Sequence, residues 1–167
     1  MFTFSLLFAL LILLPYGFLI LSYQKWLLKL NIFTPRNPTS SFQSFSIIIP
    51  ARNEDKNIGN CLSSILQNKY PSSNYEIIVI DDFSTDETAS IVQRFATKHS
   101  NIRIIQLKDI LHEHVNSYKK KAIEIAISKA SFNWIITTDA DCTAGAGWLN
   151  LFNEFIQDHN PVFIAAP

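Results

Sequence analysis

The sequence predicts an α/β protein whose mainly parallel β-sheet carries helices on both faces. Short apolar runs alternate along the chain with longer segments whose apolar residues recur every three or four positions. The apolar runs are largely continuous, which is typical of strands buried on both faces. Strands and helices in alternation require right-handed crossovers, which place helices on both sides of the sheet. The 167 residues suffice for about one domain.

Five apolar runs have the character of strands. They lie at residues 46–49, 76–80, 102–107, 133–138 and 161–166. The third run alternates and is expected nearer an edge, and the fifth begins where the sequence stops. The helical segments between them present these apolar residues inward: Ile58, Cys61, Leu62, Ile65 and Leu66; Ile91, Val92, Phe95 and Ala96; Ala122, Ile123, Ala126, Ile127 and Ala130; Trp148, Leu149, Phe152, Phe155 and Ile156. Ser84 and Glu87 predict a capping box before the second of these helices.

The first stretch of the chain is expected to lie outside this domain. Residues 2–21 carry no charge and reach the length of about 20 residues that a membrane-spanning helix needs. Basic residues follow the stretch and none precedes it, which predicts an outside N-terminus and a cytoplasmic domain. A cleaved signal peptide and an apolar helix packed on the domain are the alternatives. The expected organisation is a transmembrane helix at 1–23, a juxtamembrane segment and linker at 24–44, and the domain at 45–167.

Charge and cysteine content argue against two classes of function. The formal net charge is zero, so the chain lacks the basic footprint of a nucleic-acid-binding protein. Cys61 and Cys142 are too few for a disulfide framework. They are accompanied by no His/Cys set at zinc spacing. Both are expected to be reduced in a cytoplasmic domain and to serve packing.

Polar turns follow three of the predicted strands. They lie at residues 50–54, 81–86 and 138–141. In a parallel sheet such turns meet at one edge, where α/β proteins bind ligands. Asp139 and Asp141 would repel each other there unless a cation lies with them, and Mg²⁺ is usually held by one or two carboxylates plus substrate phosphates. This turn therefore predicts a site for a metal and a diphosphate.

A nucleoside diphosphate at this edge would need further groups. Asp82 could accept a hydrogen bond from a nucleobase N–H, and the 52–54 turn could contact the ribose. Each feature alone has a plainer explanation. Asp82 and its neighbour could cap a helix, Asp139 and Asp141 could bond turn amides, and the 52–54 turn could be a solvated ion pair. Their occurrence at three strand ends favours a shared ligand.

Together these motifs resemble the signature of family 2 glycosyltransferases, which have the GT-A fold and use nucleotide-sugar donors. The resemblance covers residues 45–167 and rests on residues 47–54, 79–88 and 138–141. It implies a nucleotide-sugar-binding role for Pro50, Ala51, Arg52, Glu54, Asp81, Asp82, Lys119 and Asp139. It also implies Mg²⁺ or Mn²⁺ as cofactor, with Asp141 as ligand and Asp139 assisting. Lys119 matches the family's lysine best, and Lys120 is the alternative in a shifted register. Tyr118 replaces the glycine that the family often has before this lysine, so the backbone path of the loop is expected to differ.

The resemblance implies an inverting transferase whose carboxylate base comes from a later acidic motif. The sequence ends at Pro167 before such a motif, so we expect the donor-binding half of a membrane-anchored enzyme, with no catalytic residue of its own. A UDP-sugar is favoured over GDP- or dTDP-sugars, and the acceptor would be a lipid or a glycan such as a cell-envelope polysaccharide. The alternatives are a non-catalytic membrane nucleotide-binding remnant and a nucleotidyltransferase with a similar sheet.

Overall fold

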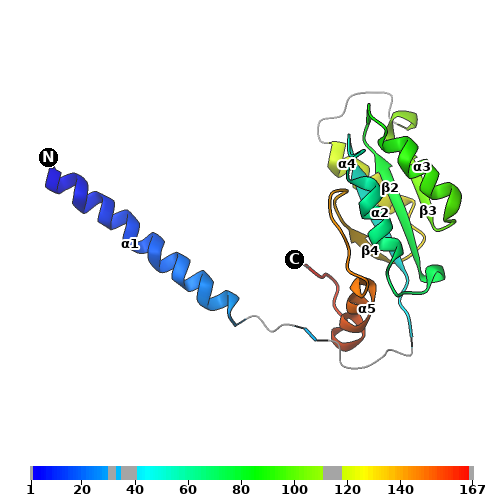
Figure 1. Ribbon diagram of the computed structural model, residues 1–167. Coiled ribbons are helices and arrows are strands. Elements are labelled where there is room, and N and C mark those ends of the chain that lie inside the picture. Colours follow the sequence, from blue (N-terminus) through cyan, green and yellow to red (C-terminus); the bar gives the residue numbers. More distant parts are fainter. Residues whose placement is uncertain (1, 30–32, 35–40, 111–117, 166–167) are drawn as a thin grey trace. The chain divides into compact units, whose positions relative to one another are not determined.

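The computed structural model describes residues 2–29, 33–34, 41–110 and 118–165. The chain divides into two compact units, Met1–Arg36 and Asn37–Pro167. The second unit contains a sheet in the order β3-β2-β1-β4, with parallel pairing throughout (Figure 1). Its strands are β1 (Phe45–Ala51), β2 (Tyr75–Asp81), β3 (Ile102–Gln106) and β4 (Trp134–Thr137). The predicted α/β class, the parallel sheet and the edge position of β3 are thus confirmed.

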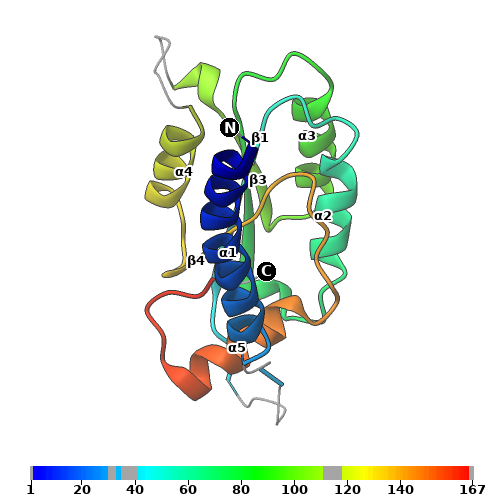
Figure 2. The same cartoon turned by 90° about the vertical axis from the view of Figure 1, so that its left-hand side faces the viewer.

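Helices cover both faces of this sheet (Figure 2). They are α2 (Ile58–Leu66), α3 (Thr88–Lys98), α4 (Tyr118–Ser128) and α5 (Trp148–His159), with short 3₁₀ turns at Ser72–Asn74 and Leu107–Asp109. Side chains of α2, α3 and α5 share one buried cluster with Ile47 and Val79. Side chains of α4 share the other with Ile48 and Ile78. Successive strand residues point to opposite faces, so a continuous apolar strand supplies both clusters.

The helix α3 begins later than the predicted capping box. The box fails because Ser84 Oγ accepts a hydrogen bond from the Asn53 amide, 3.0 Å away, and does not cap the helix. Glu87 instead accepts a hydrogen bond from Ser90 Oγ. The first turn is held by Asp86, whose Oδ1 accepts from the amide and the hydroxyl of Thr88 at 3.0 and 2.6 Å.

The predicted fifth strand does not form over residues 161–165. Asn160 ends α5 in the left-handed conformation, with φ 43°. The chain then leaves Val162 and Phe163 100% and 79% exposed. Among the described strands, none pairs with the outer edge of β4. An apolar run becomes a strand only when a neighbouring edge takes up its backbone hydrogen bonds, and this run instead lines a cavity together with residues of β4.

The first unit contains a helix, α1 (Phe2–Leu27), which includes Pro15. Across the part of the chain that the structure describes, no helix combines the length and the apolar character needed to cross a membrane. The helix that the sequence predicts here is confirmed, but its assignment as a transmembrane span over residues 1–23 is not.

Candidate functional site

The carboxyl ends of β1 and β4 form the switch point of the sheet. The chain runs from β1 outward through β2 to β3 and then returns to the other side of β1 to form β4. Such a reversal opens a crevice beyond the carboxyl ends of the strands, and ligands of α/β proteins bind there. The three polar turns that the sequence singles out follow β1, β2 and β4 at this end (Figure 1).

A pocket of about 260 Å³ lies at this switch point. Its lining consists of Pro50, Ala51, Arg52, Glu54, Asp82, Asp139, Ala140 and Asp141. All but Ala140 are residues that the sequence predicts for the donor and metal sites. Asp81 lies outside the lining: it is 1% exposed, and its Oδ1 accepts a hydrogen bond from the Ser84 amide at 3.3 Å. The side chain of Lys119 lies outside the described residues, although its backbone belongs to α4.

Asp82 is the buried acid of the pocket. It is 8% exposed, and its backbone amide donates to the carbonyl of Ala51 at 2.9 Å. Nη1 of Arg52 lies 3.9 Å from Oδ2. Oδ1 is buried and accepts no hydrogen bond from the described residues. Burial raises the pKa of Asp82; the charge of Arg52 opposes this rise and that of Asp81 adds to it.

Oδ1 of Asp82 lowers the stability of the folded protein, because burying an acceptor without a hydrogen-bond donor costs about 1–3 kcal/mol. Such a group in a native protein calls for an explanation, and a ligand donor is one. An N–H group at the base edge of a nucleotide would provide that donor. The buried position of Asp82 in the pocket lining therefore fits the predicted contact with a nucleobase.

The turn after β1 is held against the turn after β2 through Asn53, which the sequence predicts only as part of the 52–54 turn and without a role of its own. Asn53 has φ 55°, a conformation that asparagine tolerates better than most residues. Its amide donates to Ser84 Oγ at 3.0 Å, and its Oδ1 accepts from the Thr85 amide at 2.9 Å. The position of an asparagine between Arg52 and Glu54 is the sequence feature that could have indicated this structural role.

A second set of contacts continues this connection into α3. The Glu54 amide donates to Thr88 Oγ1 at 2.8 Å, and the Asp55 amide donates to Asp86 Oδ2 at 3.1 Å. Burial alone would raise the pKa of Asp86, but the hydrogen bonds from Thr88 and Asp55 lower it. The donor-side turns are thus fixed by side chains outside the pocket lining, which position Arg52 and Glu54 without touching a ligand.

The acidic turn after β4 is anchored at its middle residue. Ala140 is 3% exposed and belongs to the buried cluster, whereas Asp139 and Asp141 are exposed on either side of it. The Thr138 amide donates to the Ile48 carbonyl at 3.2 Å, which continues the pairing with β1. A small buried residue between two acids therefore holds both carboxylates at the pocket.

The two exposed carboxylates of Asp139 and Asp141 suit a metal ion that binds together with a diphosphate. Within the described ranges, no three His, Cys, Asp or Glu side chains gather into a group that could hold a metal. Asp139 and Asp141 would supply at most two protein ligands, so water and phosphate oxygens would have to complete the coordination sphere. Mg²⁺ is commonly held in this way, and the residues fit a metal bound together with a diphosphate.

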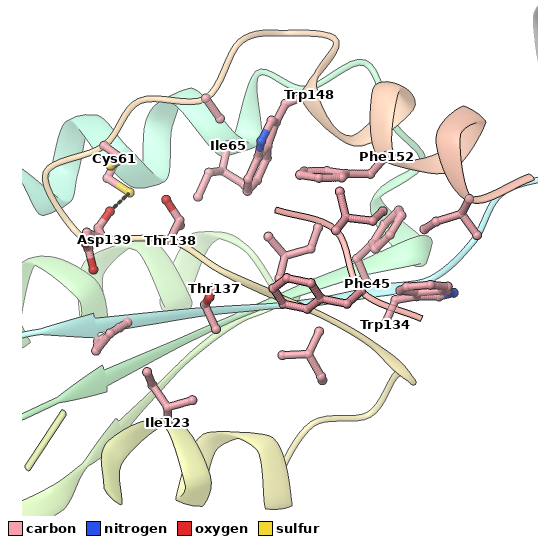
Figure 3. A pocket seen from close by; sticks show the side chains of 18 of the residues that line it. Phe45, Cys61, Ile65, Ile123, Trp134, Thr137, Thr138, Asp139, Trp148 and Phe152 are labelled. Carbon is pink, nitrogen blue, oxygen red and sulfur yellow. Dashed lines mark hydrogen bonds between the residues drawn. The ribbon is translucent and has the colours of Figure 1, made fainter. Parts of the chain in front are cut away.

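Both cysteines lie beside this turn. The Sγ of buried Cys61 lies 3.8 Å from the carbonyl oxygen of Asp139 (Figure 3). Burial, with the nearby Cys142 and Asp141, raises the pKa of Cys61 to about 11. Cys142 is exposed, and its Sγ lies 3.8 Å from Asp141 Oδ1. The sequence predicts that both serve packing, which holds for Cys61 but not for the exposed Cys142.

A parallel sheet with an acidic pocket at its switch point is typical of a nucleotide-binding α/β domain. The chain belongs to glycosyl transferase family 2, whose model matches residues 46–167. This match confirms the resemblance carried by the three motifs. It gives no support to the alternative of a nucleotidyltransferase.

Curated relatives extend the same conclusion. The glycosyltransferase AglE of Haloferax volcanii is 34% identical over 111 residues, which cover 66% of this chain and 34% of that protein. The poly(ribitol-phosphate) beta-N-acetylglucosaminyltransferase TarS of Staphylococcus aureus is 29% identical over 116 residues, covering 70% and 19%. The chain thus spans about a third or less of the length of these relatives.

Solved structures show the same fold. The mannosyltransferase PcManGT of Pyrobaculum calidifontis, in complex with GDP-Man and Mn²⁺, has a TM-score of 0.66 and 26% identity over 84% of this chain and 40% of its own. TarS 1–349 of S. aureus in complex with UDP-GlcNAc has a TM-score of 0.62 and 25% identity over 75% and 37%. These similarities support the GT-A fold.

Proposed function

We propose that this chain is the donor-binding part of an inverting glycosyltransferase that uses a nucleotide-diphospho-sugar and a divalent metal. The proposal rests on one pocket that holds two different kinds of acidic group. Oδ1 of Asp82 is a buried acceptor without a hydrogen-bond donor among the described residues, whereas the carboxylates of Asp139 and Asp141 are exposed. These groups suit the nucleobase and the diphosphate of one donor. The UDP-GlcNAc and GDP-Man bound by the similar structures support a donor of this class.

The residues of the pocket would divide the work of donor binding. Asp82 accepts the nucleobase N–H, while Arg52 lies 3.9 Å away and partly offsets its charge. Pro50, Ala51 and Glu54 line the pocket around the nucleoside. Asp139 and Asp141 would hold Mg²⁺ or Mn²⁺, which, when bound, neutralises charge on the leaving diphosphate. Lys119 is proposed to contact the same phosphates.

The catalytic base and the acceptor site are proposed to lie in polypeptide outside these residues. Every carboxylate in the pocket lining except that of Glu54 already has a part in holding the nucleobase or the metal. Oε2 of Glu54 accepts a hydrogen bond from Asn57 Nδ2 at 2.8 Å. The matched relatives are much longer than this chain, which supports a base and an acceptor site supplied elsewhere. A lipid or a glycan is the proposed acceptor.

Titration calorimetry with UDP and Mn²⁺ tests the donor site. We expect Asp82→Ala and Asp141→Ala each to weaken UDP binding by about ten-fold or more, the effect of about 1.4 kcal/mol. Asp158→Ala changes an exposed acid of α5 outside the pocket and should bind as the parent does. Parent-like UDP affinity in both pocket variants would refute the assignment.

We also propose that the enzyme works at a membrane, with its glycosyltransferase domain on the cytoplasmic side. The support is α1, whose described side chains include Leu11, Phe18 and Trp26 at 72, 74 and 72% exposed. Apolar side chains in such numbers favour contact with lipid over water. The full chain should float with phosphatidylcholine vesicles in a density gradient, and a chain starting at residue 37 should not. Equal flotation of the two chains would exclude α1 as the attachment.

A further inference from the structure

The two cysteines of the chain meet at one backbone oxygen. The carbonyl of Asp139 lies 3.8 Å from Cys61 Sγ and accepts a hydrogen bond from the Cys142 amide at 3.2 Å. Cys61 reaches this oxygen from α2 (Figure 3). Cys142 belongs to the turn that carries Asp139 and Asp141. Residues 81 positions apart in the sequence are thereby brought to the same backbone oxygen.

Further hydrogen bonds hold the two elements together. The Ala144 amide donates to Ser64 Oγ at 2.9 Å, and the Lys69 amide donates to the Ala146 carbonyl at 2.9 Å. The segment that carries Cys142 is therefore attached to α2 and to the residues just after it. The two thiols also differ in access: Cys142 is exposed, whereas Cys61 is 1% exposed beneath the turn.

We propose that Cys61 and Cys142 form a disulfide when the protein meets hydrogen peroxide, and that this bond disables the acidic turn. The exposed sulfur of Cys142 attacks the peroxide oxygen, becomes a sulfenic acid and releases water. The sulfur of Cys61 then attacks the sulfenic sulfur, and a second water leaves as the S–S bond forms. The two thiols lose two electrons and two protons in total, and the peroxide is reduced to water.

The bond would change the geometry of the pocket. A disulfide requires its two Cβ atoms to approach to about 3.8 Å. The Sγ of Cys142 now lies beside Asp141 Oδ1, 3.8 Å away, and would have to turn from this carboxylate toward α2. Asp141 is the next residue and would be displaced with it. The expected loss of metal and diphosphate binding rests on the proposed function, whereas formation of the disulfide does not.

Peptide mapping of the full chain tests the disulfide directly. The protein is treated with a few equivalents of hydrogen peroxide, blocked with N-ethylmaleimide and digested without reductant. We expect mass spectrometry to find the peptides of Cys61 and Cys142 joined, with both thiols lost together. Cys142→Ala should leave Cys61 free to react with the maleimide after unfolding. Separate blocking of both thiols in the treated parent, or a bond between two chains, would overturn the proposal.

The functional consequence is measured by UDP and Mn²⁺ binding in the same samples. We expect the oxidised parent to bind UDP at least ten-fold more weakly and to recover with dithiothreitol. Cys142→Ala should bind UDP as the reduced parent does, before and after peroxide. A joined peptide with unchanged UDP binding would refute the effect on the pocket. Absence of UDP binding in the reduced parent would instead refute the proposed function and leave the disulfide result intact.

Discussion

Asp82 places a cost on the unliganded protein. Its carboxylate is buried with one oxygen that the described residues leave without a donor, and burial raises its pKa. A folded-state pKa above the unfolded value favours the folded state at low pH, and this contribution is lost as the pH rises through the folded pKa. Ionisation of this buried carboxyl therefore costs the free protein stability, and such perturbed groups are common at functional sites.

Removing this charge should stabilise the free protein at neutral pH. We expect Asp82→Asn to raise Tm by about 2–4 °C at pH 7.5, as a gain of roughly 0.5–1 kcal/mol would do. The difference should disappear below about pH 4, where aspartate is protonated in the unfolded chain as well. Scanning calorimetry from pH 3.5 to about 8 measures this. A lower Tm at pH 7.5 than in the parent would contradict it, and Asp158→Asn serves as the exposed control.

Glu76 has the opposite behaviour. Its side chain is 13% exposed and lies between Ser46 Oγ, at 2.6 Å, and Arg103 Nη2, at 3.0 Å. Burial alone would raise the pKa of Glu76, but the hydrogen bonds from Ser46 and Ser131 and the charge of Arg103 lower it. A lowered pKa contributes stability above the unfolded value, near pH 4.3, and this contribution disappears as the pH falls through the folded pKa.

Loss of this carboxylate should therefore destabilise the fold. We expect Glu76→Gln to lower the free energy of unfolding by about 1–3 kcal/mol at pH 7, because Arg103 loses its partner and two donors lose a charged acceptor. The penalty should shrink in acid. Urea unfolding at pH 7 and at about pH 3.5 provides the measurement. An equal penalty at both values would mean that the charge of Glu76 contributes nothing.

At the scale of elements, the donor side of the pocket depends on two facing turns more than on the strands they follow. Asn53 is the centre of this arrangement, with a positive φ and hydrogen bonds to Ser84 and Thr85. Alanine would lose the side-chain hydrogen bond and keep the strained conformation, whereas glycine would lose only the bond.

These two substitutions separate conformation from hydrogen bonding. We expect Asn53→Ala to cost about 2 kcal/mol of stability and Asn53→Gly about 1 kcal/mol, with UDP binding weakened in the same order. Urea unfolding and UDP calorimetry on the pair provide the measurements. A glycine variant less stable than the alanine variant would show that chain entropy, and not strain, dominates at this position.

The predictability of each element depended on how local its determinants are. The buried face of α2 could be predicted because Ile58, Cys61, Leu62 and Ile65 follow the helical repeat, and all four are buried. The start of α3 could not, because Ser84 bonds across to Asn53 instead of along its own chain. The Asp82 pocket was predicted from three strand ends, but the acceptor without a donor appears only once burial is known.

The fifth strand failed for a related reason. Its residues have strand propensity, but pairing depends on whether another edge is at the right place and distance. Val162 is fully exposed, and of the segment's described residues, 161–165, only Ile164 packs against the main buried cluster. No pattern within six residues contains that information, because backbone hydrogen bonds between strands are made over long sequence separations.

At the scale of the whole molecule, the strand order creates the site and an open edge together. Returning the chain to form β4 beside β1 produces the switch-point pocket. The same strand order makes β4 an edge strand of the sheet. A cavity of about 1320 Å³ lies along it, lined by Phe45 and Trp134 from the strands, Ile123 from α4, and Trp148 and Phe152 from α5 (Figure 3).

The open edge of β4 is expected to make the protein self-associate in solution. The strand Trp134–Thr137 carries no lysine, glutamate or proline that would discourage a second molecule from adding its own strand. We expect light scattering to show an apparent mass that rises with protein concentration. Thr137→Lys, at an exposed position, should suppress this rise, whereas Thr97→Lys on α3 should not. If the parent protein stays monomeric at millimolar concentration, the edge strand β4 does not need a charged residue to prevent pairing with a second molecule.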